Sequence, residues 1–276
     1  PIENRLSELW SIFNYLMPDY LYSYEYFRKH FESPIVNDGD EYASNMLKKM
    51  IGPFILRRRK MDVLKDLPEK IERVYYANFD SRQKEIYDAQ VMKISKLVEN
   101  EDEKAFSTSK IAILAELMKV RQICCDPSLL LENYKGGSAK KDTCLQLIEE
   151  SIDGGHKLLV FSQFTSMLEI LEEELNKKKI AYYKITGATD KKERLELCNK
   201  FNKDDVKVFL ISLKAGGTGL NLIGADIVIH YDPWWNEAVI SQATDRTHRI
   251  GQTNTVTVYK LIAKDTLEEK ILKLQE

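Results

Sequence analysis

The sequence predicts an α/β protein in which a doubly wound parallel sheet follows a mainly helical amino-terminal extension. Three observations support this fold class. Short apolar segments alternate with helical segments over residues 136–276, which is typical of βαβ units. Segments such as VFLI and IVI are apolar throughout, as expected of strands that helices cover on both faces. Residues 1–72 show helical periodicity instead.

The extension is expected to contain three helices. From Asn4 to Met17 apolar residues recur at helical spacing, and Pro18 ends the segment. Two further helices are expected at 24–31 and 41–51, separated by turns that contain proline and glycine. We therefore assign residues 1–72 to a helical domain.

Residues 73–135 are expected to connect the extension to the second domain. A strand is predicted at 70–79 and helices at 81–98 and 111–124. The glycine-containing segment 134–138 is the best candidate for a linker.

The second domain, residues 136–276, shows the strict alternation of strands and helices. Asp190 and Glu193 form a capping box at the start of one helix. We expect strands at 157–161, 181–185, 207–211, 226–231 and 255–262, and helices at 139–151, 166–177, 190–201, 237–249 and 266–274.

Composition excludes several classes of protein. The chain has 276 residues, 43% of them hydrophobic, which is enough for a sizeable core. Its 41 basic and 43 acidic residues give a net charge of -2, so nucleic-acid binding would require a local basic patch. The apolar segments are strand-sized and too short to span a membrane, so we expect no membrane partner.

The cysteine pattern indicates the cellular compartment. None of the four cysteines lies in a Cys-x-x-Cys pair, so we expect no metal site, no disulfides and an intracellular location. That location would be the cytoplasm or nucleoid in a prokaryote and the nucleus in a eukaryote.

The chain begins with Pro1 and ends within a helical pattern, which we interpret as a piece of a longer protein.

A glycine-rich segment follows one predicted strand. In open α/β sheets ligands bind beyond the carboxyl ends of the strands, so these loops are the candidate site. Gly216, Gly217 and Gly219 in SLKAGGTGLNL allow backbone amides to approach an anion closely. A tight turn is the alternative explanation.

Two arginines lie close to this loop in the predicted fold. Gln242, Arg246 and Arg249 are spaced at i, i+4 and i+7, which predicts one shared helix face. A solvent-exposed stripe is the alternative, but these residues lie at the ligand-binding edge of the sheet. Two guanidinium forks would suit a phosphoryl group.

Half of a phosphate-transfer site is missing from this sequence. No G-x-x-x-x-G-K-[ST] loop is present, and no Asp-Glu pair follows an apolar strand to bind magnesium. If phosphate chemistry occurs here, the other half of the site lies elsewhere.

Eight ordered segments together resemble the Swi/Snf-type ATPases, which are double-stranded-DNA translocases of helicase superfamily two. The resemblance covers nearly the whole chain, from the end of the first RecA-like lobe through the second. The segments are PIENRLSELWSIFNYLMP, FILRRRKMDVLKDLPEK, VRQICCDPSLL, FSQFTSMLE, ITGATDKKER, SLKAGGTGLNL, DPWWNEA and DRTHRIGQ.

The resemblance implies specific roles for the glycine loop and the arginines. Arg246 and Arg249 would be arginine fingers that reach across a cleft to ATP with Mg2+, which the first lobe of the same chain would bind. Gly217 and Gly219 would lie beside the nucleotide, and Gln242 would help to couple nucleotide to DNA.

The resemblance also implies contacts with the backbone of double-stranded DNA. Hydroxyl groups, amides and lysines position phosphates without reading sequence. Only one of the two adjacent tryptophans is expected to contact DNA, because they point in opposite directions if extended. The candidate contacts are Ser162, Gln163, Phe164, Gly187, Thr189, Lys214, Trp234 and Trp235.

The same resemblance makes the extension part of the first lobe's protrusion and places Arg57 to Lys60 at the junction between lobes. The expected partners are the first lobe of the same chain and a DNA-bound target protein, and the chain alone should not hydrolyse ATP. A non-catalytic module that binds duplex DNA or a partner protein is the alternative, and an RNA helicase lobe is a further competitor.

Overall fold

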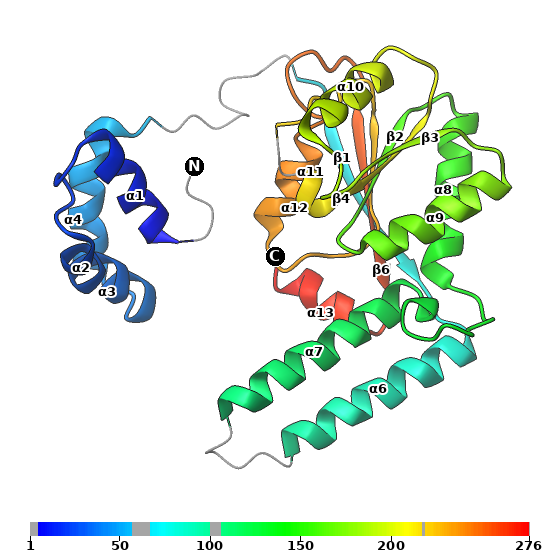
Figure 1. Cartoon of the computed structure of the whole chain (residues 1–276), viewed down its shortest axis with the longest axis horizontal. Coiled ribbons are helices and arrows are strands. Elements are labelled where there is room, and N and C mark those ends of the chain that lie inside the picture. Colours follow the sequence, from blue (N-terminus) through cyan, green and yellow to red (C-terminus); the bar gives the residue numbers. More distant parts are fainter. Residues whose placement is uncertain (1–4, 57–66, 100–105, 217–218, 276) are drawn as a thin grey trace. The chain divides into compact units, whose positions relative to one another are not determined.

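The computed structural model describes residues 5–56, 67–99, 106–216 and 219–275, without the side chains of 106–110. The chain divides into two compact units, Pro1–Lys65 and Asp66–Glu276 (Figure 1). The division therefore lies in the charged segment that precedes the first strand. The basic run Arg57 to Lys60 lies outside the described residues.

The first unit is helical, as expected. Aromatic and leucine side chains at helical spacing, among them Leu9, Phe13 and Phe27, form its core. Ser23 and Asp40 cap α2 and α4 by accepting hydrogen bonds from backbone amides. Its elements are α1 (Leu6–Leu16), α2 (Tyr24–Phe27), the π-helix η1 (Arg28–Glu32), α3 (Ser33–Asn37), α4 (Glu41–Ile51) and the 3-10 turn η2 (Gly52–Phe54).

The second unit contains a sheet of six parallel strands in the order β1-β6-β5-β2-β4-β3, which confirms the predicted fold class. The three central strands are buried along their whole length, because helices cover both faces. The strands are β1 (Lys70–Ala77), β2 (Leu158–Ser162), β3 (Tyr182–Ile185), β4 (Val208–Ser212), β5 (Ile227–His230) and β6 (Val256–Ala263).

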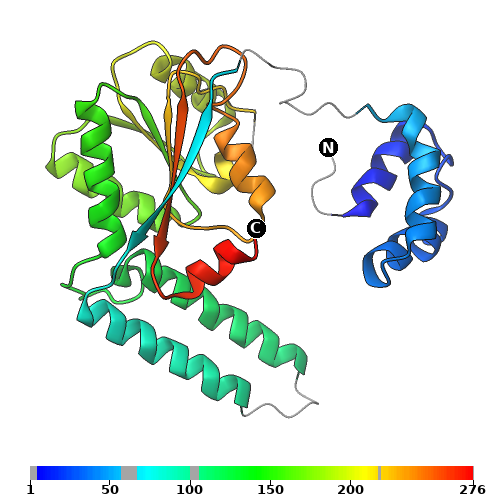
Figure 2. The same ribbon diagram turned by 180° about the vertical axis from the view of Figure 1, so that it is seen from behind.

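Two groups of helices cover the two faces of the sheet (Figure 1, Figure 2). Leu168 of α9 and Ile148 of α8 pack on one face, whereas Phe201 of α10 and Ile240 of α12 pack on the other. The helices are α8 (Ala139–Asp153), α9 (Thr165–Lys177), α10 (Lys191–Phe201), α11 (Leu213–Gly216) and α12 (Glu237–Thr244).

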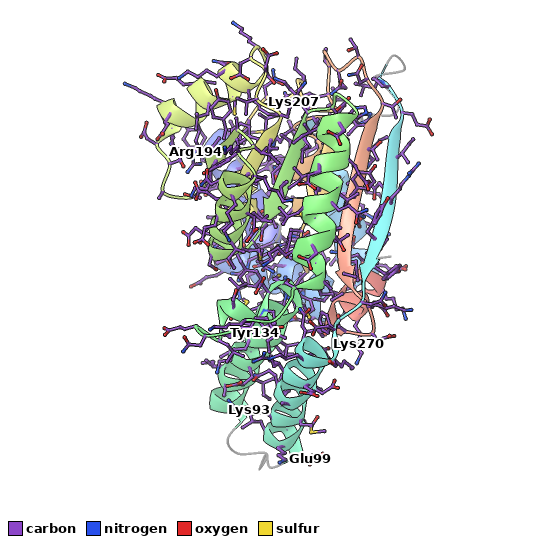
Figure 3. The ribbon with its side chains drawn as sticks, turned by 90° about the vertical axis from the view of Figure 1, so that its right-hand side faces the viewer. Lys93, Glu99, Tyr134, Arg194, Lys207 and Lys270 are labelled. Atoms are coloured by element: carbon purple, nitrogen blue, oxygen red, sulfur yellow. The ribbon has the colours of Figure 1, made fainter. Side chains whose placement is uncertain are left out.

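A helical hairpin, α6 (Ser81–Glu99) and α7 (Phe106–Cys125), extends from the carboxyl end of the sheet together with α13 (Leu267–Lys273). Tyr87 of α6 packs there with Val120 and Cys124 of α7. Figure 3 shows Lys93 and Glu99 toward the far end of the hairpin, whereas Lys207 lies at the opposite end of the unit.

The glycine-containing segment 134–138, predicted as a linker, is a short packed loop inside the second unit. Ser138 is buried and its Oγ donates a hydrogen bond to the carbonyl oxygen of Cys125 at 2.9 Å. Tyr134 likewise donates to the carbonyl of Gly137. These contacts hold the loop against α7, so the loop does not separate the two units.

A buried ion pair connects α8 to α13. Lys140 Nζ lies 2.8 and 2.9 Å from the two carboxylate oxygens of Glu268, and both side chains are almost completely buried. Burial opposes the charge of Lys140, but the neighbouring carboxylate outweighs it and raises the pKa of the amine. Glu268 also accepts a hydrogen bond from the backbone amide of Ala263.

His230, at the end of β5, is a buried neutral histidine. Its Nε2 lies 2.9 Å from Thr244 Oγ1, and its ring stacks on Phe161. Burial, reinforced by Lys260, lowers the pKa of His230 to about 3 from the ordinary 6.5. The imidazole therefore stays uncharged at neutral pH.

The lowered pKa of His230 predicts that the folded protein loses stability at acid pH. The unfolded chain binds the proton near pH 6.5 but the folded protein binds it only near pH 3, so the stabilisation is complete above pH 6.5 and is lost as the pH falls. We expect the free energy of unfolding to fall by about 1.4 kcal/mol per pH unit below pH 6.5 from this group. Urea unfolding of His230→Phe, measured across this pH range, should show a shallower dependence of the unfolding free energy on pH than the wild type. An unchanged slope in His230→Phe would contradict the assignment.

Candidate functional site

The candidate site lies where the strands of the second unit end. The arrowheads of β1 and β6 in Figures 1 and 2 point toward α7 and α13, and parallel strands place their carboxyl ends at one edge of the sheet. The loops after β2, β3, β4 and β5 carry the glycines and the other surface residues that the sequence singled out, whereas Gln242 lies in α12 and the two arginines follow that helix.

The glycine loop begins directly after β4. Lys214 is exposed on α11, whereas Gly216 at the end of α11 packs so closely on Phe161 that a Cβ there would lie 2.8 Å from the ring. Gly219 is exposed, has a φ of +45°, and has open space where a Cβ would be. Gly217 lies outside the described residues. The glycines thus serve two purposes, close packing at Gly216 and a left-handed backbone at Gly219.

The predicted helix face that Gln242, Arg246 and Arg249 would share is wrong. Helix α12 ends at Thr244, and the chain continues as a series of turns. The carbonyl oxygen of Arg246 accepts a hydrogen bond from the amide of Leu222 in the glycine loop, at 3.0 Å, so it does not continue the helix. Half-buried Gln242 is the one member of this set that lies within the helix.

Both arginines contact the glycine loop nevertheless. Arg246 Nε donates to the carbonyl of Gly216 at 3.1 Å, and Arg249 Nη1 donates to the carbonyl of Leu220 at 3.2 Å. Burial, with repulsion from Arg249, lowers the pKa of Arg246. Two guanidinium groups held close together repel one another, so an anion bound between them would be stabilised.

The loops after β2 and β5 are held together by Asp232. Its carboxylate accepts hydrogen bonds from Ser162 Oγ at 2.5 Å and from the backbone amide of Gln163 at 3.3 Å. Ser162 and Asp232 are both buried, and burial raises the pKa of the aspartate. Ser162 therefore supports the loop from within, whereas Gln163 and Phe164 are half-buried at its surface.

The loop after β3 contains Gly187 and Thr189 and is organised by Arg194. Arg194 Nη2 donates to the carbonyls of Thr186 and Gly187, and Nε donates to the carbonyl of Thr189. Arg194 lies near the start of α10, beside this loop (Figure 3). A Cβ on Gly187 would meet open space, so this loop presents its backbone to the surroundings. Asp190 caps α10 by accepting a hydrogen bond from the amide of Lys192.

The two adjacent tryptophans differ in environment, as expected. Trp234 packs against the core on the α12 face of the sheet, whereas Trp235 is 48% exposed. The exposed ring is therefore the one that could contact a ligand.

Sequence analysis missed Asp232 and Arg194. A carboxylate directly after a buried strand, as at Asp232, is a usable signal. Arg194 had no signal of its own, because its role depends on the path of the preceding loop.

Backbone groups, Lys214 and the exposed ring of Trp235 lie at the carboxyl edge of the sheet. The arginines do not lie at that edge as predicted, because the segment that carries them contacts Pro68 and Leu222, which precede β1 and β5. Among the residues that the structure describes, no three His, Cys, Asp or Glu side chains are grouped to hold a metal ion. Within the same residues, no helix combines the length and apolar character that crossing a membrane requires. The arrangement is therefore suited to binding anions through arginine and backbone groups.

Two family models match the chain. Residues 1–129 match the SNF2-related domain, and residues 139–251 match the helicase conserved C-terminal domain. An uncharacterised ATP-dependent helicase of Mycoplasma pneumoniae is 38% identical over 280 residues, which is all of this chain but 26% of that protein. The chain thus spans about a quarter of the length of such curated relatives.

Solved structures are similar as well. The C-terminal domain of the Sulfolobus solfataricus SWI2/SNF2 ATPase is 34% identical with a TM-score of 0.64, over 75% of this chain and 85% of that one. The ATPase core from the same organism, in complex with double-stranded DNA, is 38% identical with a TM-score of 0.65, over 99% of this chain and 58% of that one.

Proposed function

Because this chain belongs to the SWI2/SNF2 family of ATPases, we propose that it is the carboxyl-terminal part of a motor that hydrolyses ATP and translocates on double-stranded DNA. Such a motor would remodel or displace proteins bound to the DNA. The observation that carries the proposal is the pair Arg246 and Arg249, which both donate hydrogen bonds to the glycine loop that follows β4.

In the proposed mechanism the arginines act on ATP that another lobe of the same protein binds with Mg2+. Closure of the cleft between lobes would bring both guanidinium groups to the phosphates, where they would stabilise the charge of the transferring phosphoryl group. The contact of Arg249 with Leu220 uses one of its five N–H donors, so the fork retains donors for phosphate. Gly217 and Gly219 would lie beside the nucleotide, and Gln242 would help to couple nucleotide binding to DNA binding.

DNA would bind along the loops after β2, β3, β4 and β5. Backbone groups at Gly187 and Thr189, the exposed Lys214 and the ring of Trp235 are the surface groups suited to phosphates and sugars. Gln163 and Phe164 complete this surface, with Ser162 and Trp234 behind it. The similarity to an ATPase core solved with double-stranded DNA supports duplex DNA as the partner.

Translocation distinguishes this proposal from the alternative of a non-catalytic DNA-binding module. The full-length protein should displace a triplex-forming oligonucleotide from duplex DNA with ATP but not with a non-hydrolysable analogue. The lag before displacement should lengthen with the distance between the entry site and the triplex. DNA binding without any ATP-dependent displacement would contradict the proposal and favour the binding module.

His248 lies between the arginines and is expected to position them. Its Nε2 lies 2.8 Å from the carbonyl oxygen of Pro68, just before β1, so it fastens the arginine loop to the start of the second unit. We expect His248→Ala to lower kcat for ATP about tenfold, with KM changed less than twofold. His248→Gln, which can still donate to Pro68, should recover most of the rate. Equal losses in both variants, or a change in KM alone, would contradict this role.

A further inference from the structure

Arg121 is a buried cation that the site described above does not use. It lies near the end of α7, is 2% exposed, and donates from Nη2 to the carbonyl oxygen of Pro233 at 2.6 Å. Its Nε and Nη1 are buried and have no hydrogen-bond partner. Pro233 belongs to the loop after β5, so this one bond connects α7 to the candidate site.

The guanidinium group is surrounded by aromatic rings from that same edge of the sheet. Its Cζ lies 5.4 Å from the ring centroid of Trp235, 5.6 Å from that of Trp234 and 5.9 Å from that of Phe164. All three distances lie within the range of cation–π attraction, which is stronger where the cation is desolvated. Arg121 therefore contacts the loops after both β2 and β5.

Burial of the Arg121 guanidinium costs hydration, and the groups that offset this cost lie in the loops after β2 and β5. They are the carbonyl oxygen of Pro233, the three aromatic rings and the buried carboxylate of Asp232. Two of these rings, those of Phe164 and Trp235, belong to the proposed DNA surface. Trp235 is 48% exposed, and its ring also contacts the buried guanidinium of Arg121.

We propose that Arg121 is a positioning residue for DNA binding, which holds the ring of Trp235 and the loop after β2 in the conformation that receives the DNA backbone. This inference rests on the proposed function. It gives α7 a defined role, because Arg121 of this helix contacts the loops that form the proposed DNA surface. Substitution of Arg121 should therefore weaken DNA binding without affecting Arg246 and Arg249, which are proposed to act on ATP.

The test is a double-mutant cycle in the full-length protein, measured as the duplex DNA concentration that half-maximally stimulates ATP hydrolysis. Arg121→Met keeps the length and packing of the side chain but removes the charge and the bond to Pro233. We expect it to raise that concentration about tenfold, with maximal ATP turnover changed less than twofold. Trp235→Ala should have a similar effect, and adding Arg121→Met to it should cause no further rise, because both changes remove one interaction.

Two further variants keep the test decisive. Lys119→Gln removes a positive charge from the same helix that pairs with Glu116 and contacts none of the three rings, so it should behave like the wild type. Arg121→Lys retains the charge without the planar fork and should raise the half-maximal concentration about threefold, which covers the case that Arg121→Met does not fold. Additive effects of Arg121→Met and Trp235→Ala, or wild-type DNA dependence in both Arg121 variants, would overturn the inference. If duplex DNA did not stimulate ATP hydrolysis by the wild-type protein, that result would instead contradict the proposed function.

Discussion

Arg249→Ala is expected to lower DNA-stimulated ATP turnover about a thousandfold in the full-length protein, with ATP affinity nearly unchanged. In the proposed mechanism the guanidinium stabilises charge that develops on the transferring phosphoryl group, so its removal should affect the transition state more than the bound nucleotide. Arg249 is held by the carbonyl of Leu220, and Arg246 is held beside it by that of Gly216. Measuring kcat together with the Kd of a fluorescent ATP analogue separates the two effects.

A matched control distinguishes the finger role from a general loss of positive charge. Arg73 lies exposed on the edge strand β1 and does not belong to the site, so Arg73→Ala should keep turnover within twofold of the wild type. Arg249→Lys should recover little activity, because an ammonium group lacks the fork that matches a phosphoryl group. Turnover of Arg249→Ala within a few-fold of the wild type would exclude Arg249 as a finger.

The largest expected effect on stability comes from the buried pair of Lys140 and Glu268. Lys140→Met leaves the Glu268 carboxylate buried without its cation, and should lower the free energy of unfolding by about 3–5 kcal/mol. Combining it with Glu268→Gln should recover most of that loss, because a glutamine retains an acceptor for the amide of Ala263 and carries no charge. Urea unfolding, followed by circular dichroism, measures both changes.

An exposed ion pair provides the comparison. Lys178 and Glu149 are bonded on the surface, with 39% and 45% of their side chains exposed, so Lys178→Met should cost less than about 1 kcal/mol. If Lys140→Met were no more destabilising than Lys178→Met, or if Glu268→Gln made it worse, the buried pair would not be the determinant of stability that its geometry indicates.

The strands were predictable from local sequence, whereas the path of the arginine loop was not. Strands such as β4 are apolar throughout because both faces are buried, and that pattern is visible without the fold. The end of α12 depends instead on the carbonyl of Arg246, which bonds Leu222 from a distant segment. Helical spacing continues past Thr244 in the sequence, so periodicity alone extends the helix too far.

In the candidate site, too, some features were predictable from the sequence and others were not. The glycine loop was recognisable because an unusual segment follows a predicted strand. The position of the arginines was not, because they lie toward the amino ends of β1 and β5 rather than at the predicted carboxyl edge. Asp232 and Arg121 act through contacts between segments far apart in the chain, such as the bond from Arg121 to Pro233. The exposed ring of Trp235 was expected as one of a pair, but only the packing of Trp234 on the core identifies which of the two is outside.

The most direct test of the motor account is steady-state ATP hydrolysis by the full-length protein with and without double-stranded DNA, measured beside the isolated chain of residues 1–276. The account predicts strong stimulation by duplex DNA, little by RNA, and no hydrolysis by the isolated chain, because its arginines act on ATP bound elsewhere. Intact protein that hydrolyses no ATP with any nucleic acid would contradict the account and leave a DNA-binding or partner-binding module in its place.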